Sequence, residues 1–213
     1  MVIHPHDYWL SPLGALLGLA STAYLSQIFL GTQNPWFIAP MGASAVLLFA
    51  VPASPLAQPW SVIGGNLIAA SVGVTCAQLI APPILSVAIA GSVAIALMMR
   101  LRCLHPPSGA VALTAILGGS SISALGYQFV LFPVLANSLF LITLAIIFNR
   151  LCKRDYPHHP QAIPSKKTGV LEITLEDVET ALRQHHELLD IDENDLLNIV
   201  NETEQIAANR RKQ

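Results

Sequence analysis

The chain has 213 residues, of which 53% are hydrophobic and only 11% are charged, and its formal net charge is -2. A mean hydropathy of +0.56 is outside the usual range of soluble globular chains and excludes a purely soluble protein. Asp, Glu, Lys and Arg are absent from residues 8–99 and again from residues 103–149, which predicts segments embedded in a lipid bilayer.

Charge divides the chain into two parts. Residues 155–213 contain 12 Asp and Glu against 6 Lys and Arg, a net charge of -6, whereas residues 1–154 contain one acidic residue against five basic ones. We therefore expect a membrane-embedded helical bundle over residues 1–154. Residues 155–213 should form an acidic cytosolic tail, with a linker followed by a pair of short helices.

Six apolar segments are predicted in the membrane part. In chain order they are residues 11–31, 40–52, 60–80, 84–100, 107–119 and 127–149. Four are long enough to cross the hydrocarbon core as helices. The second and fifth are too short, so each is predicted to be a half-helix completed by extended chain, or a re-entrant hairpin. The first has no basic residue before it, which favours a retained span over a cleaved signal peptide.

Basic residues indicate the direction of these segments. Arg100 and Arg102 follow the fourth segment, and Arg150, Lys153 and Arg154 follow the last. Because Lys and Arg collect at cytoplasmic ends, both places should lie inside and the chain between them should cross twice. This favours six passes with both termini inside. The expected location is the plasma (inner) membrane of a bacterium. Four full spans are the alternative.

The two short segments share a motif. Both begin Pro-x-Gly-Ala-x-Ala, at residues 40–45 and 107–112, and an Asn lies in the segment after each, at Asn66 and Asn137. Three passes in each half would invert the second half, as in many transporters whose broken helices meet near the midplane. The predicted fold class is therefore an all-α membrane bundle of two inverted three-helix halves, with short or broken helices at the Pro-Gly motifs.

The Pro-Gly starts favour an anion site. Proline suits the first helical position, and the backbone N–H groups after it lack partners within the helix. Such a start presents donors and the positive end of a helix dipole to an anion. An alternative is that Pro and Gly only permit tight packing and a helix break. The candidate substrate-binding residues lie at these starts or are polar groups near them: His105, Pro106, Pro107, Ser108, Gly109, Pro40, Gly42, Ser44, Asn66 and Asn137.

His105 is the titratable side chain beside the second start. It is a candidate to donate a hydrogen bond to an anion, or to carry a proton that couples transport to a proton gradient. The alternatives are that it caps the turn or lies at the level of the lipid headgroups.

Three motifs in this order resemble the HPP family of integral membrane proteins. They are residues 40–47 (PMGASAVL), 55–66 (PLAQPWSVIGGN) and 104–110 (LHPPSGA), and the resemblance covers about residues 10–150. It implies a small helical bundle, usually described as four-spanning, and a transporter. Plant chloroplast and cyanobacterial relatives are linked to nitrite transport, which makes nitrite the implied substrate. The positions that carry over are His105, Pro106, Pro107, Ser108, Gly109, Pro40, Gly42, Ser44 and Asn66.

These observations predict a transporter or channel for a small inorganic anion. The alternative is a membrane-anchored signalling or scaffold module that acts through the acidic tail. An enzyme is not expected, because residues 8–149 offer one His and no carboxylate for acid-base chemistry. We expect no cofactor, metal site or nucleic-acid partner. The expected partners are the lipid bilayer and the anion, and self-association into a homo-oligomer is left open.

The acidic tail carries two helix-start signals. Thr174 and Asp177 resemble a capping box before an apolar stripe that extends to Leu189, and Asp192 with Asp195 repeats the signal before Leu196.

Overall fold

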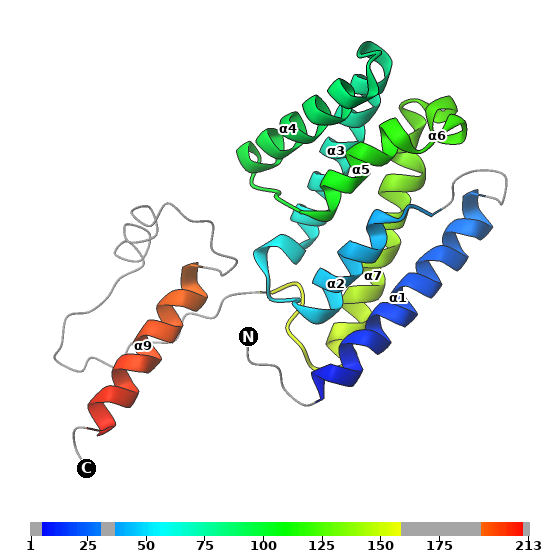
Figure 1. Cartoon of the computed structure of the whole chain (residues 1–213). Coiled ribbons are helices and arrows are strands. Elements are labelled where there is room, and N and C mark those ends of the chain that lie inside the picture. Colours follow the sequence, from blue (N-terminus) through cyan, green and yellow to red (C-terminus); the bar gives the residue numbers. More distant parts are fainter. Residues whose placement is uncertain (1–5, 31–36, 159–192, 211–213) are drawn as a thin grey trace. The chain divides into compact units, whose positions relative to one another are not determined.

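The computed structural model describes residues 6–30, 37–158 and 193–210. The chain divides into two compact units, Met1–His158 and His159–Gln213, and each is described by itself. In the first unit the described elements are helical: α1 Asp7–Leu30, α2 Pro40–Ala50, η1 Pro55–Ala57, α3 Pro59–Leu79, α4 Pro83–Arg100, α5 Pro107–Leu117, α6 Ser120–Leu125, η2 Val130–Leu135 and α7 Ala136–Leu151 (Figure 1).

All six apolar segments predicted from the sequence are helical. Four helices are long and apolar enough to cross a membrane, namely α1, α3, α4 and the continuous stretch of η2 and α7. Helices α2 and α5 have only 11 residues each. At 1.5 Å per residue each is about 16 Å long, roughly half of the 30 Å hydrocarbon core. The prediction of two short helices at the Pro-Gly motifs is confirmed.

Proline determines where several of these helices begin. Helices α2, α3, α4 and α5 each start with a proline, Pro40, Pro59, Pro83 and Pro107. Its fixed φ suits the first turn, and its missing N–H has no partner there in any case. A different proline, inside η2, adjoins Phe132, whose backbone is not helical (φ -136°, ψ 113°). This interruption of the last span was not predicted.

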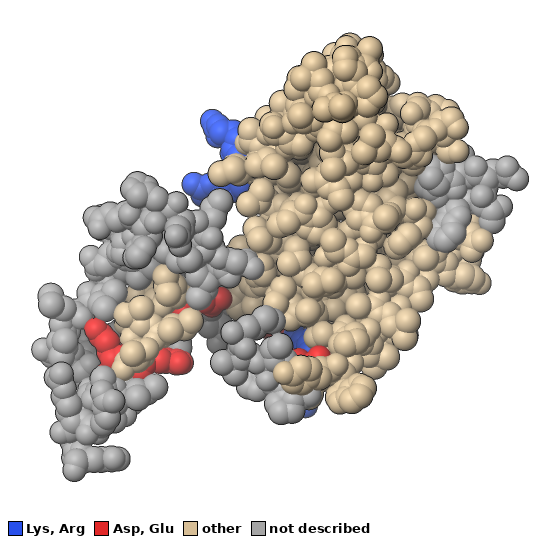
Figure 2. All heavy atoms as spheres, viewed as in Figure 1, with Lys and Arg blue, Asp and Glu red and all other residues tan. Residues whose placement is uncertain are grey.

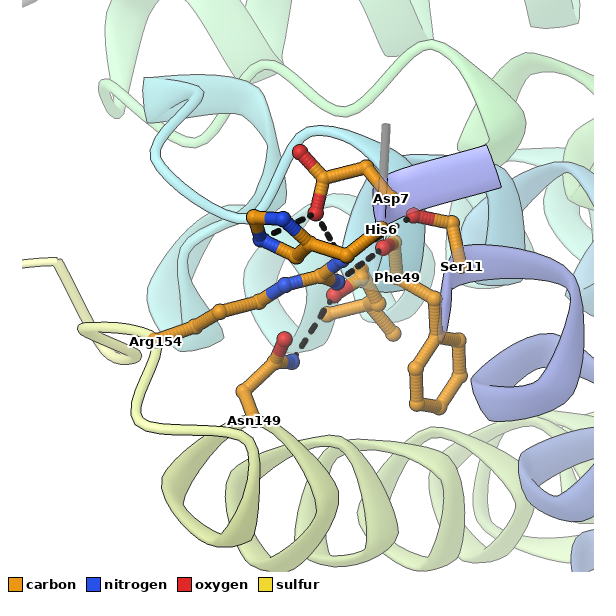
Figure 3. Close-up of polar contacts among 7 residues, drawn as sticks. His6, Asp7, Ser11, Phe49, Asn149 and Arg154 are labelled. Atoms are coloured by element: carbon orange, nitrogen blue, oxygen red, sulfur yellow. Dashed lines mark hydrogen bonds and ion pairs between the residues drawn. The ribbon is translucent and has the colours of Figure 1, made fainter. Parts of the chain in front are cut away.

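An arginine after α7 joins three helices at one end of the unit. The Arg154 guanidinium donates to the Phe49 carbonyl at the end of α2, 2.9 Å away, and pairs with Asp7 at the start of α1 (Figure 3). Ser11 of α1 lies within 3.4 Å of the same guanidinium, and Asn149 of α7 donates to another carbonyl near the end of α2. The start of α1 and the ends of α2 and α7 therefore meet.

Two further contacts bring the remaining helix ends to the same side. The Trp60 indole at the start of α3 donates to the Leu101 carbonyl just after α4, 3.2 Å away. His105, just before α5, is bonded to the Leu56 carbonyl in η1, which connects α2 to α3. Successive helices therefore alternate in direction, and the second half is inverted relative to the first. We call this side the basic end, because the five basic residues of residues 1–154 lie in the last turns of α4 and α7 or just after them.

The helices pack as two groups of three. The first trio is α1, α2 and α7, and the second trio is α3, α4 and α5 (Figure 1). The third helix of each half thus packs with the first two helices of the other half. Helices α2 and α5 also touch, and α3 contacts η2 and α7, so the trios meet along the short helices and the third helices. The chain passes between the trios at residues 51–58 and 118–135.

The surface of this unit fits a lipid environment. Large apolar side chains project outward from α1 and α4, with Trp9 82% and Ile84 87% exposed. Figure 2 shows a face of the first unit that is almost free of charged side chains. Such an apolar surface would be unfavourable in water and is what a bilayer requires.

The second unit contains one described helix, α9, at Glu193–Arg210. The predicted helix over Leu196 is therefore observed, while Asp192, which belongs to the second helix-start signal, lies outside the described residues. The first signal, at Thr174 and Asp177, lies outside the described residues.

Candidate functional site

The two Pro-Gly helix starts have the same local structure. The residues before the first helical proline, Ala39 and Pro106, have nearly identical backbone angles (φ -53°, ψ -36° and φ -53°, ψ -39°). Pro40 and Pro107 are both buried, and the glycine two positions later is half-buried in both helices. The sequence repeat is therefore also a structural repeat.

The backbone donors at these starts are already bonded. The Ser108 N–H donates to the His105 carbonyl at 2.9 Å, and the Gly109 N–H donates to the Pro106 carbonyl at 3.0 Å. The start of α2 is bonded in the same way. The expectation of free backbone donors is wrong here, because the preceding residue already has helical angles and its neighbours supply carbonyl acceptors. Only the side chains and the helix dipole remain to interact with an anion.

His105 links the second helix start to α2. Its imidazole is fully buried, with Nε2 2.9 Å from the Ser44 hydroxyl and Nδ1 2.8 Å from the Leu56 carbonyl oxygen. A carbonyl oxygen only accepts, so Nδ1 carries a hydrogen. In the neutral ring Nε2 is then the acceptor, and Ser44 donates to it.

Asn66 makes a second buried link. Its side-chain oxygen accepts from the Ser108 hydroxyl at 2.7 Å, and its amide nitrogen donates to the Ser138 hydroxyl at 2.9 Å. Ser138 in turn donates to a carbonyl of its own helix. All three side chains are fully buried. Asn66 therefore joins the start of α5 to α7 in the other trio.

Asn137 of α7 makes the equivalent contact in the first trio. Its side-chain oxygen accepts from the Ile38 N–H, just before α2, at 3.2 Å, and its amide donates to the Ser26 hydroxyl of α1 at 2.8 Å. The Asn of each third helix thus bonds the start of the short helix in its own trio. We call the buried side chains of these contacts the central polar network: Ser26, Ser44, Asn66, His105, Ser108, Asn137 and Ser138.

The glycines of the two starts are not explained by packing. A Cβ added to Gly42 or to Gly109 would meet no atom of the described chain within 4 Å. By contrast, a Cβ on Gly73 of α3 would lie 2.5 Å from the Ala112 carbonyl oxygen of α5. Tight packing therefore accounts for Gly73 but not for the repeated glycines, although a helical glycine costs about 1 kcal/mol relative to alanine.

The structure brings together most of the candidate residues. His105 meets Ser44, Ser108 meets Asn66, and Asn137 lies beside the start that contains Pro40. Pro106 is exposed and contributes its carbonyl oxygen to the first turn. Two network members, Ser26 and Ser138, were not among the candidates. Ser138 directly follows Asn137, but nothing in the sequence distinguishes Ser26 from the other small polar residues of the spans.

A small cavity lies away from this network. It has a volume of about 80 Å³ and is formed by the far ends of α3 and α5 with α6, at Val74, Ala77, Gln78, Ala115, Ile122, Ser123 and Gly126. None of the candidate residues lines it.

Several antiparallel helices, four of them able to span a bilayer, around a buried polar network define a multi-pass membrane protein. The sequence model of the family described as HPP, transmembrane region, matches residues 2–157, and the chain belongs to this family. The resemblance stated from the three motifs is thus confirmed.

Two relatives from Dictyostelium discoideum carry names that describe them only as transmembrane proteins. They are 36% and 33% identical to this chain over 154 residues, which is 70% of the chain and 53% and 49% of the respective relatives. The chain therefore spans about half the length of the curated relatives that it matches. No solved structure matches the chain.

Proposed function

We propose that this protein transports a small inorganic anion, with nitrite as the substrate, and that the anion passes where the starts of α2 and α5 approach each other. The observation that carries the proposal is the pair of equivalent helix starts. Each start has a glycine that faces open space. The Ile38 N–H just before α2 and the Ser108 hydroxyl in α5 each donate to the side-chain oxygen of a buried Asn. Transport is favoured over catalysis because residues 8–149 contain no carboxylate for acid-base chemistry.

The chemistry of the central polar network favours a small anion with a single charge. The network offers hydroxyl, amide and imidazole groups, which can turn from one another to a substrate. The described contacts of Asn66, for example, use one of its two amide hydrogens. The two helix dipoles would add about 0.3 to 2 kcal/mol each. Because no Lys or Arg lies within the spans before Arg100, a second negative charge would remain uncompensated.

Uptake into proteoliposomes tests this function. Liposomes that contain the full chain should take up nitrite faster than protein-free liposomes. Sulfate should enter both kinds of liposome at the same rate. A double variant, Ser44→Ala with Ser108→Ala, should reduce nitrite uptake. The matched control is Ser92→Ala, whose exposed hydroxyl bonds only to a carbonyl of its own helix. Uptake equal to that of protein-free liposomes would contradict the proposal.

We also propose that the basic end faces the cytoplasm of a bacterial cell, with the plasma membrane as the site of action. The support is the collection of Arg100, Arg102 and the basic residues at the end of α7 on that side. In a variant without its native cysteines, an impermeant thiol reagent added to intact cells should label Gln78→Cys and not Lys153→Cys. The opposite labelling pattern would contradict this orientation.

A further inference from the structure

We propose that His105 carries a proton together with the anion, so that the protein works as an anion–proton symporter. The inference rests on the proposed transport function and adds the second transported species. It starts from the two hydrogen bonds of the buried imidazole, which leave one ring nitrogen able to gain and lose a proton.

The geometry assigns the exchanging proton to Nε2. The Leu56 carbonyl accepts from Nδ1 at 2.8 Å in either charge state, so the hydrogen on Nδ1 stays in place. Nε2 faces the Ser44 hydroxyl at 2.9 Å, and a hydroxyl both donates and accepts. This nitrogen therefore has a suitable partner whether or not it carries a hydrogen.

Ser44 has a second acceptor that makes both states possible. Its hydroxyl lies 3.4 Å from the Pro40 carbonyl oxygen in the preceding turn. When the imidazole is neutral, Ser44 donates to Nε2. When Nε2 gains a proton, it donates to the Ser44 oxygen, and the serine hydrogen turns to Pro40. In both states the Ser44 hydroxyl and both imidazole nitrogens have hydrogen-bond partners. Protonation therefore avoids the free-energy cost of a buried donor or acceptor without a partner.

The surroundings disfavour a charged imidazole unless an anion is present. Burial opposes the imidazolium form, and so does the positive end of the α5 dipole that begins beside it. Helices α2 and α5 contain no titratable residue, and α3 contains only Cys76. The loop that carries His105 contains Cys103 and the exposed Arg102, and the exposed Arg100 ends α4 just before it. Near η1 is Tyr156, whose hydroxyl donates to the Ala57 carbonyl.

No carboxylate on these elements offsets the charge, so the compensating charge has to come from the substrate. An anion beside His105 would favour protonation of Nε2, and protonation would favour the anion by the same factor, because binding linkage is reciprocal. The anion and the proton should therefore bind and leave together. One negative and one positive charge then cross at the same time, and the transport step moves no net charge.

Proteoliposomes that contain the full chain and a trapped pH-sensitive dye test this inference. Nitrite is added outside, and internal pH and accumulated nitrite are measured together, with membrane voltage set by potassium and valinomycin. Nitrate is run in parallel, because its fully ionised form does not leak through lipid as a neutral acid. We expect internal acidification to accompany anion uptake above the protein-free rate, faster uptake with an inward proton gradient, and no dependence on voltage.

Two variants locate the proton. In the His105→Gln variant an inward proton gradient should no longer accelerate anion uptake. In the control variant His158→Gln the gradient should still accelerate it. Ser44→Ala keeps the Leu56 contact of the imidazole but removes the partner of Nε2, so it should shift the pH at which uptake is half-maximal. This second variant is informative even if His105→Gln does not fold, which size-exclusion chromatography would show.

The outcomes separate the two proposals. Nitrite uptake without accompanying proton movement, or a pH profile unchanged by Ser44→Ala, would overturn the symport inference and leave the transport function standing. Absence of nitrite and nitrate uptake would overturn the transport function, and the inference with it.

Discussion

At the scale of single residues, the buried hydroxyl of Ser108 depends on one partner. It donates to the side-chain oxygen of Asn66 at 2.7 Å, and both residues are fully buried. In a membrane protein a buried polar group cannot exchange this bond for one with water. The network therefore contributes to stability as well as to the proposed site.

We predict that Ser108→Ala destabilises the protein by about 1 to 3 kcal/mol, because it leaves the Asn66 oxygen without its donor. The measurement is thermal unfolding of the purified protein in detergent. Ser92→Ala, which removes an exposed hydroxyl bonded within its own helix, should unfold at nearly the wild-type temperature. An equal fall in unfolding temperature in the two variants would contradict a stabilising role for the contact between Ser108 and Asn66.

Arg154 is the second residue with a large predicted effect. Its side chain is only 15% exposed and bonds both the Phe49 carbonyl and Asp7 (Figure 3). Arg154→Ala should cost about 1 to 3 kcal/mol, because the buried Phe49 carbonyl loses its side-chain donor and Asp7 loses its arginine partner. Arg150→Ala, at an exposed position in the last turn of α7, is the matched control in the same unfolding experiment. A greater loss of stability in the Arg150→Ala variant than in the Arg154→Ala variant would contradict the stabilising role of the Arg154 contacts.

At the scale of helices, the sequence predicts where each helix lies along the chain better than it predicts which helices pack together. The segments at 60–80 and 84–100 are observed at Pro59–Leu79 and Pro83–Arg100, because a bilayer requires long apolar helices with internally bonded backbones. The interruption at Phe132 was missed, although Pro133 inside the segment at 127–149 disfavours helical angles at the residue before it. The bonded state of the first-turn donors was also missed, because it depends on the helical ψ of Pro106, which the proline ring does not fix and which the following Pro107 disfavours.

The pairing of helices across the two halves was likewise not predictable from chain order. Helix α3 packs with α4 and α5 of the second half, and the contact is close at Gly73. Gly73 looks like any small residue of a membrane helix until its neighbour in α5 is known.

We predict that Gly73→Ala costs about 1 to 3 kcal/mol, since the new methyl group would lie 2.5 Å from a backbone oxygen of α5 and would force the helices apart. Gly91→Ala, in α4, places its methyl group in open space. That control should gain up to about 1 kcal/mol from the higher helix propensity of alanine. Thermal unfolding of both variants checks the difference, and a stable Gly73→Ala protein would contradict the close crossing of α3 and α5.

At the scale of the whole membrane unit, the polar network lies where the two trios meet. Ser44 of the first trio bonds His105 of the second, and Asn66 of the second bonds Ser138 of the first. A movement of one trio against the other would break and remake these contacts. Five of the seven network residues could be predicted, because they lie in the repeated Pro-Gly starts or are the His and Asn residues near them. Their partners could not be, because the halves exchange their third helices.

The central claim is that the repeated glycines of the two Pro-Gly starts, Gly42 and Gly109, act on the substrate and not on the fold. Nitrite uptake and thermal unfolding measured together for Gly42→Ala, Gly109→Ala and the control Gly91→Ala test it most directly. All three methyl groups would enter open space, so none should lower the unfolding temperature. We predict that uptake falls several-fold in the Gly42 and Gly109 variants and is unchanged in the Gly91 variant. Wild-type uptake by both Gly42→Ala and Gly109→Ala would contradict the account.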